Sequence, residues 1–240
     1  MDSKNKSLNS YAIGLRDGIP IGLGYLSVSF TFGMMAVNMG LPVWAAVLIS
    51  MTNLTSAGQF AGLGLIVASA TYFEMILTQM VINLRYALMS LSISQKADKT
   101  FNILHRFLIS FGVTDEIFAV ATGKPSEIGR RYMYGLITAP YIGWALGTFL
   151  GAAASIILPA TLRSALNIAI YGMFIAIIVP PAKHSRPVLL VLLLAVALSF
   201  AIRYIPVLQN LSSGFVIIIC AIVASALGAI LFPLKEEDKP

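Results

Sequence analysis

Long apolar runs divided by short polar links fill nearly the whole of this sequence. Of its 240 residues 58% are hydrophobic and 11% are charged, whereas soluble domains usually carry about 25% charged residues. A soluble domain of this size could not cover its surface with so few charges, and a disordered chain would be poor in hydrophobic residues. A membrane-spanning helix needs about 20 mainly apolar residues, so the chain is predicted to be an integral membrane protein with apolar sequence for about six or seven spans.

Eight apolar segments can be delimited, and each is predicted to be helical because a helix satisfies its own backbone hydrogen bonds in lipid. The segments run from Gly14 to Met39, Leu41 to Ala70, Tyr72 to Ile93, Phe107 to Thr122, Tyr132 to Leu158, Ala165 to Val179, Val188 to Ile205 and Gly214 to Phe232. Polar ends, residues 1–13 and 233–240, flank them. No link is long enough for a soluble domain, so residues 1–240 are predicted to form one all-α polytopic membrane domain.

The basic residues lie mainly in the polar links, as the positive-inside rule describes for cytoplasmic loops. This placement explains the net charge of +6 without nucleic-acid binding. If all eight segments crossed, with the N-terminus inside, the link that holds Lys96, Lys99 and Arg106 would lie outside. If residues 41–70 and 107–122 re-enter instead, six crossings remain, and nearly all link cations and both chain ends are cytoplasmic. Length alone favours a simple crossing by residues 41–70, which would give seven or eight spans.

Both candidate re-entrant segments contain residues that interrupt an apolar helix. A polar patch from Asn53 to Gln59 lies at the centre of the first, and Gly112 precedes Thr114, Asp115 and Glu116 in the second. Non-helical backbone at membrane depth is tolerated where protein or a water-filled cavity surrounds it. Since the two segments would enter from opposite sides, the pattern predicts two broken helices and is typical of an inverted repeat.

Asp115 and Glu116 are the clearest functional candidates, because ionisable residues at membrane depth are costly. Thr114 or an acid can cap the helix that starts here, and acids suit the positive end of its dipole. Two adjacent acids exceed what capping needs. We therefore expect one cap and one carboxylate that binds a substrate ammonium or carries a proton, without knowing which is which.

Arg85 lies too deep in its segment to reach the headgroups easily, so it must pair with an acid or face a cavity. An internal ion pair with Asp115 or Glu116 and direct contact with substrate are equally good interpretations. Asn83 is a polar residue two positions before Arg85. Glu74 begins the same segment and is expected at the membrane interface.

The patch from Asn53 to Gln59 supplies amides and hydroxyls without charge. If Thr55 or Ser56 caps the helix that follows, the free N–H groups form a site suited to a carboxylate. Interhelical hydrogen bonding is the alternative role for these side chains, and it is the favoured one for Asn167. Phe60, with Phe111, would accept an apolar side chain of the substrate.

Several short motifs together resemble the AzlC family over about residues 12–205. In chain order they are Arg16-Asp17-Gly18-Ile19-Pro20, Phe32-Gly33, Ala57-Gly58-Gln59-Phe60, Asn83-Leu84-Arg85, Thr114-Asp115-Glu116 and Gly147-Thr148. The chain looks like the large subunit of that family's branched-chain amino acid exporters. The resemblance implies a bacterial or archaeal plasma-membrane transporter that exports valine, leucine or isoleucine, and a small AzlD-type membrane subunit as partner. One departure is Asn167, where the family often has an acid, so coupling or substrate selection here can differ.

The sequence thus predicts a secondary exporter of small hydrophobic amino acids. No nucleotide-binding motif is present, so a proton gradient is the default energy source. The expected substrate-binding residues are Asn53, Thr55, Ser56, Gln59, Phe60, Asn83, Arg85 and Thr114, with Asp115 or Glu116 for ion coupling. No enzymatic motif, cofactor or metal site is expected. The alternative is a channel-like or partner-dependent membrane subunit for another small zwitterionic solute.

Overall fold

The computed structural model describes residues 9–159, 161, 175, 178–206, 208 and 211–233. Most of the predicted segment at residues 165–179, including Asn167, and the outermost residues of both polar ends lie outside these described residues. The chain divides into two compact units, Met1–Phe60 with Asn83–Pro159, and Ala61–Ile82 with Ala160–Pro240. Each unit is described by itself.

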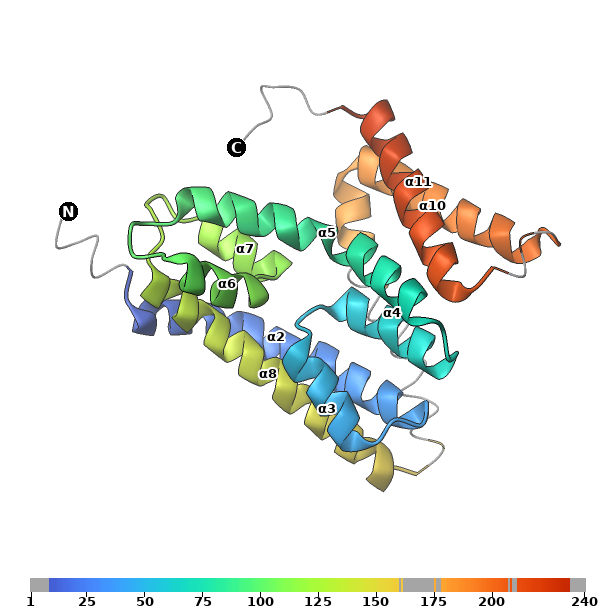
Figure 1. Cartoon of the computed structure of the whole chain (residues 1–240), viewed down its shortest axis with the longest axis horizontal. Helices are drawn as coiled ribbons and strands as arrows, with labels where there is room; N and C mark the ends of the chain where they lie inside the picture. Colours follow the sequence, from blue (N-terminus) through green and yellow to red (C-terminus); the bar gives the residue numbers. More distant parts are fainter. Residues whose placement is uncertain are drawn as a thin grey trace. The chain divides into compact units, whose positions relative to one another are not determined.

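The named elements are all α-helices, as the sequence predicts (Figure 1). They are α2 (Tyr11–Asn38), α3 (Val43–Thr52), α4 (Ser56–Val67), α5 (Tyr72–Lys96), α6 (Ile103–Phe111), α7 (Asp115–Thr122), α8 (Arg130–Ile157), α10 (Arg186–Tyr204) and α11 (Ser213–Leu231). Among the described residues, α2, α5, α8, α10 and α11 are long and apolar enough to cross a membrane. The protein therefore has the fold of a multi-pass membrane protein. The number of crossings and the inverted repeat stay predictions.

In the first unit, α2 and α8 lie side by side along most of their lengths, and glycines make this possible (Figure 1). A Cβ atom placed on Gly14 would lie 2.0 Å from the carbonyl oxygen of Tyr132, and one on Gly151 would lie 1.9 Å from that of Phe30. Gly143 meets the backbone of α2 in the same way. Small residues let membrane helices approach to backbone contact, so these glycines allow α2 and α8 to pack closely.

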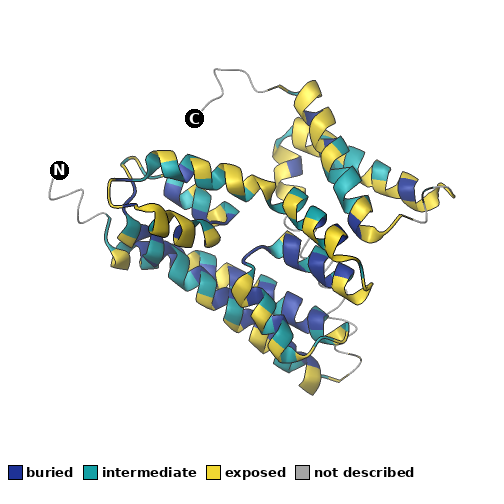
Figure 2. Ribbon diagram, in the orientation of Figure 1, coloured by how far each residue is buried: buried dark blue, intermediate teal, exposed yellow. Residues whose placement is uncertain are grey.

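Buried residues gather where α2 and α8 face each other, whereas α10 and α11 are largely exposed (Figure 2). Many of the exposed side chains are large and apolar, among them Leu84, Leu88 and Leu91 on α5 and Phe200 on α10. In a soluble protein such a surface would favour aggregation. On helices of this length and composition it is the surface that meets lipid.

Both predicted breaks are present in the backbone of the first unit. The first lies between α3 and α4, where Asn53 has an extended conformation with φ −143° and ψ 97°. The second lies between α6 and α7, where Gly112 ends one helix and extended Thr114 precedes the next. The four helices that flank the breaks have 10, 12, 9 and 8 residues. Each is shorter than the roughly 20 residues that a single span requires.

In the second unit, Glu74 lies buried against the start of α11. Its side chain is 5% exposed, and its Oε1 accepts hydrogen bonds from Ser212 Oγ at 2.5 Å and from Gly214 N at 2.9 Å. Glu74 therefore caps the N-terminus of α11, where a carboxylate suits the helix dipole. Its placement at the membrane interface stays a prediction. Its partners lie more than a hundred positions away along the chain, which no local pattern reveals.

Candidate functional site

Thr55 holds the first break in place. Its hydroxyl accepts the Gly58 N–H at 3.3 Å and so caps the start of α4. The same hydroxyl donates to Asn83 Oδ1 on α5 at 2.9 Å. Of the two predicted caps, Thr55 or Ser56, the structure thus uses Thr55, and it ties the break to the polar part of α5.

Thr114 holds the second break. Its Oγ1 accepts the Ile117 N–H at 3.4 Å, which caps α7. The Tyr25 hydroxyl of α2 lies 2.6 Å from the same oxygen and also hydrogen-bonds the carboxylate of Glu116. The expectation that one of the two acids serves as the cap was therefore wrong. The Thr114 hydroxyl, at the N-cap position, accepts the free N–H group at the start of α7. The side chains of Asp115 and Glu116 are therefore available for other contacts.

Asp115 and Glu116 have different partners. Asp115 Oδ2 lies 2.7 Å from Arg85 Nη1, and both side chains of this ion pair are 42% exposed. This is one of the two interpretations that the sequence left open for Arg85. The guanidinium also donates to Tyr86 Oη at 3.1 Å and lies over the Tyr86 ring. Glu116 instead turns toward Tyr25, so the neighbouring acids are divided between α5 and α2.

The C-terminal end of α7 is held as well. The Lys96 ammonium at the end of α5 donates to the carbonyl oxygens of Thr122 and Lys124. Lys124 lies in the link beyond α7, with its ammonium 3.6 Å from the centre of the Tyr132 ring. Burial lowers the pKa of Lys124, and the nearby negative charge of Asp17 partly opposes this shift. The short helix that carries both acids is thus anchored at each end.

A cavity of about 190 Å³ lies where the two breaks meet α5. Its polar lining includes Asn53, Thr55 and Asn83, and its apolar lining includes Phe111 and Val113. The remaining lining residues are Thr52, Leu54, Tyr86 and Ser110. Amides and a helix start on one side and apolar side chains on the other are a combination suited to a small zwitterion with an apolar side chain.

Gln59, by contrast, is held away from this cavity. It is 1% exposed, its Oε1 accepts from Trp144 Nε1 at 2.7 Å, and its Nε2 donates to Ser50 Oγ at 2.8 Å. Ser50 and Thr148 are in turn 2.7 Å apart. Because both ends of the amide are engaged, Gln59 joins α3, α4 and α8 around the first break.

The other predicted site residues do not line the cavity, and among them are Arg85, Thr114, Asp115 and Glu116. Phe60 packs edge-to-face on Phe32 at 5.6 Å and does not line the cavity. Ser56 is half-buried at the start of α4 and is also outside the lining. The structure thus brings Asn53, Thr55 and Asn83 together at the cavity.

Sequence reasoning missed Tyr25, Tyr86 and Trp144, which lie in apolar helices. A usable signal existed, because the polar tip of a buried Tyr or Trp usually finds a partner. What the sequence does not give is the identity of that partner.

Comparisons with known proteins agree on a membrane family. A family model described as AzlC protein matches residues 20–158, a range that contains both breaks and the ion pair. An uncharacterized membrane protein of Archaeoglobus fulgidus is 34% identical over 190 residues, which is 78% of this chain and 83% of that protein. Inner membrane protein YgaZ of Escherichia coli K12 is 30% identical over 143 residues, 58% of each chain. No solved structure matches the chain.

Proposed function

Because the chain belongs to the AzlC family, we propose that it is a secondary transporter that exports branched-chain or other small hydrophobic amino acids, driven by protons. The observation that carries the proposal is the cavity at the two capped breaks. The ion pair of Arg85 and Asp115 is not part of its lining, but Tyr86, which lines the cavity, accepts a hydrogen bond from Arg85. Discontinuous helices with polar ends at a common site are the usual substrate site of secondary transporters.

In the proposed binding step, the substrate replaces the internal ion pair by two new ones. The substrate carboxylate pairs with the Arg85 guanidinium or hydrogen-bonds the side-chain amides of Asn53 and Asn83. The substrate ammonium pairs with the Asp115 carboxylate. A zwitterion has no net charge, so this exchange leaves the net charge of the site unchanged. The apolar side chain lies against Phe111 and Val113, which favours valine, leucine and isoleucine over polar amino acids.

Glu116 is the proposed proton carrier. When Glu116 is ionised it accepts a hydrogen bond from the Tyr25 hydroxyl, and when it is protonated that hydroxyl can donate to Thr114, the cap of α7, instead. Protonation is thereby linked to the hydrogen bonding of the second break. Asp115 is assigned to the ammonium because it is the acid that already faces a cation.

The proposal extends to topology and partners. Six crossings with two re-entrant segments would leave both chain ends in the cytoplasm of a bacterial or archaeal cell, and a small AzlD-type subunit would assemble with the chain. The chain is proposed to be a carrier and not an enzyme. A channel-like or partner-dependent subunit for another small zwitterionic solute is the competing function.

Efflux of radiolabelled valine from loaded liposomes, with the chain alone and with a small AzlD-type subunit, tests the function. We expect proton-dependent efflux that a proton uncoupler abolishes. Asp115→Asn and Glu116→Gln should each lower the initial rate by about tenfold or more, since a hydrogen bond to a charged group contributes about 1.5–3 kcal/mol.

Glu127→Gln is the matched control, because Glu127 is an exposed acid in the link after α7. Unchanged efflux in both site variants, at normal protein levels, would overturn the assignment. Efflux that follows the valine gradient and ignores the uncoupler would point to a channel.

A further inference from the structure

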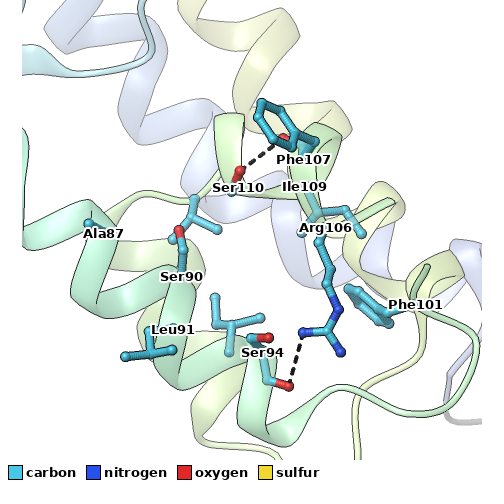
Figure 3. A pocket seen from close by; sticks show the side chains of 11 residues that line it. Ala87, Ser90, Leu91, Ser94, Phe101, Arg106, Phe107, Ile109 and Ser110 are labelled. Carbon is cyan, nitrogen blue, oxygen red and sulfur yellow. Dashed lines mark hydrogen bonds between the residues drawn. The ribbon is translucent and has the colours of Figure 1, made fainter. Parts of the chain in front are cut away.

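A second cavity, of about 340 Å³, forms a groove in the first unit between α5 and α6 (Figure 3). Ala87, Ser90, Leu91 and Ser94 line it from α5, and Arg106, Phe107 and Ser110 line it from α6. It shares only Ser110 and Val113 with the cavity at the breaks. The transport proposal makes no use of its largest side chains.

The groove opens on the apolar surface of the protein. Its rims, Leu91 on α5 and Phe107 on α6, are 60% and 78% exposed. The rims continue as further exposed apolar residues, Leu88 on α5 and Leu104 on α6. Ile109 of α6 is in contrast 2% exposed and faces the core. An occupant of the groove would therefore be in contact with the acyl region of the bilayer.

Arg106 gives one end of the groove a positive charge. Its side chain reaches across the groove toward the end of α5, where Nη1 lies 3.5 Å from the carbonyl oxygen of Ser94 (Figure 3). Within the described part of the chain, no carboxylate lies at ion-pair distance from it. Two nearby cations are engaged elsewhere, since Lys96 binds carbonyls at the end of α7 and Arg130 donates to His105.

The occupant that fits these features has an anionic head and a long apolar tail. Basic pockets between membrane helices, close to a basic link, are suited to acidic lipid headgroups. We propose that the groove binds one anionic phospholipid, with its phosphate at Arg106 and an acyl chain along Leu91 and Phe107. The hydroxyls of Ser90 and Ser94 face the same space and can donate to the phosphate or ester oxygens.

The binding test uses the purified full chain in detergent, titrated with phosphatidylglycerol, with phosphatidylcholine of the same acyl chains and with inorganic phosphate. Phosphatidylglycerol should raise the Tm most. Arg106→Gln should weaken its binding by about fivefold, and Arg106→Lys should retain most of it. Arg131→Gln is the control, because Arg131 is exposed but does not line the groove.

Equal effects of the two lipids, or of phosphate and phosphatidylglycerol, would overturn the proposal, as would wild-type binding by Arg106→Gln. A photo-crosslinker in place of Phe107 identifies the occupant in membranes. A phospholipid adduct supports the proposal, whereas an adduct with a second copy of the chain or with another polypeptide contradicts it. Neither readout depends on transport, so the result is independent of the function proposed above.

Discussion

At the scale of single residues, Asp115 and Glu116 show how adjacent acids acquire different roles. Successive side chains on a helix point in directions about 100° apart, so two adjacent residues in the first turn of α7 can contact two different neighbouring helices. Asp115 meets Arg85 of α5, and Glu116 meets Tyr25 of α2. The separation follows from the register of α7, which the Thr114 cap sets.

Tyr25→Phe tests the proposed proton link. The ring should keep its edge-to-face packing on Trp144, at 5.2 Å, while the hydrogen bonds to Thr114 and Glu116 are lost. We expect normal protein levels and export reduced by about tenfold, the loss expected for a hydrogen bond to a charged group. Initial rates of valine efflux at several proton gradients provide the measurement. Tyr72→Phe, at a side chain that is 89% exposed, is the control and should export normally.

At the scale of elements, the short helices are positioned by side chains and not by their own length. Isolated helices of about ten residues are marginal, so α3, α4, α6 and α7 depend on their neighbours. The positions of both breaks could be predicted, because polar residues and Gly112 interrupt apolar runs. The contacts could not be predicted, since Gln59 and its partner Trp144 are 85 positions apart in the chain.

Gln59→Leu tests the role of this network. The change keeps the volume but leaves the Trp144 N–H without its partner, whereas the Ser50 hydroxyl keeps its hydrogen bond with Thr148. An unsatisfied buried group costs about 1–3 kcal/mol. A fall in Tm of the purified protein is therefore expected, with a weaker effect on substrate affinity than on stability. Gln95→Leu, at an exposed position near the end of α5, should leave the Tm unchanged. A similar Tm in both variants would mean that the network does not hold the break.

The glycine contact between α2 and α8 makes a sharper stability prediction. Gly151→Ala would place a Cβ 1.9 Å from the Phe30 carbonyl oxygen, so the helices must separate at a cost of about 1–3 kcal/mol. Gly24 lies in α2, and no other atom lies within 4 Å of a Cβ placed on it. Gly24→Ala should stabilise the protein by about 0.5–1 kcal/mol because alanine is the better helix former. Denaturant unfolding of the two variants side by side should give opposite signs.

At the scale of the whole chain, composition and charge placement predict the class of protein without further information. Few charges and long apolar runs leave a membrane protein as the one suitable class, and the all-helical fold follows from backbone hydrogen bonding in lipid. The topology is less constrained, because residues 41–70 are long enough to cross and only the basic links favour re-entry.

Thiol labelling decides between these topologies. On a Cys220→Ala background, which removes the sole cysteine, we expect Met39→Cys and Ala70→Cys to react with a membrane-impermeant reagent added outside intact cells. Lys99→Cys should react only after permeabilisation. Labelling of positions 39 and 70 from opposite sides would show that the segment between them crosses the membrane.

The contact between α2 and α8 also limits how the protein can change shape. Where two backbones touch, no layer of side chains lies between the helices that could switch rotamers and allow them to slide. The pair is therefore expected to stay stationary during a transport cycle, while the capped short helices on either side of the cavity tilt against it. Opening to one compartment and then the other would consist of rearrangements around residues 53–55 and 112–114, with α2 and α8 as the fixed frame.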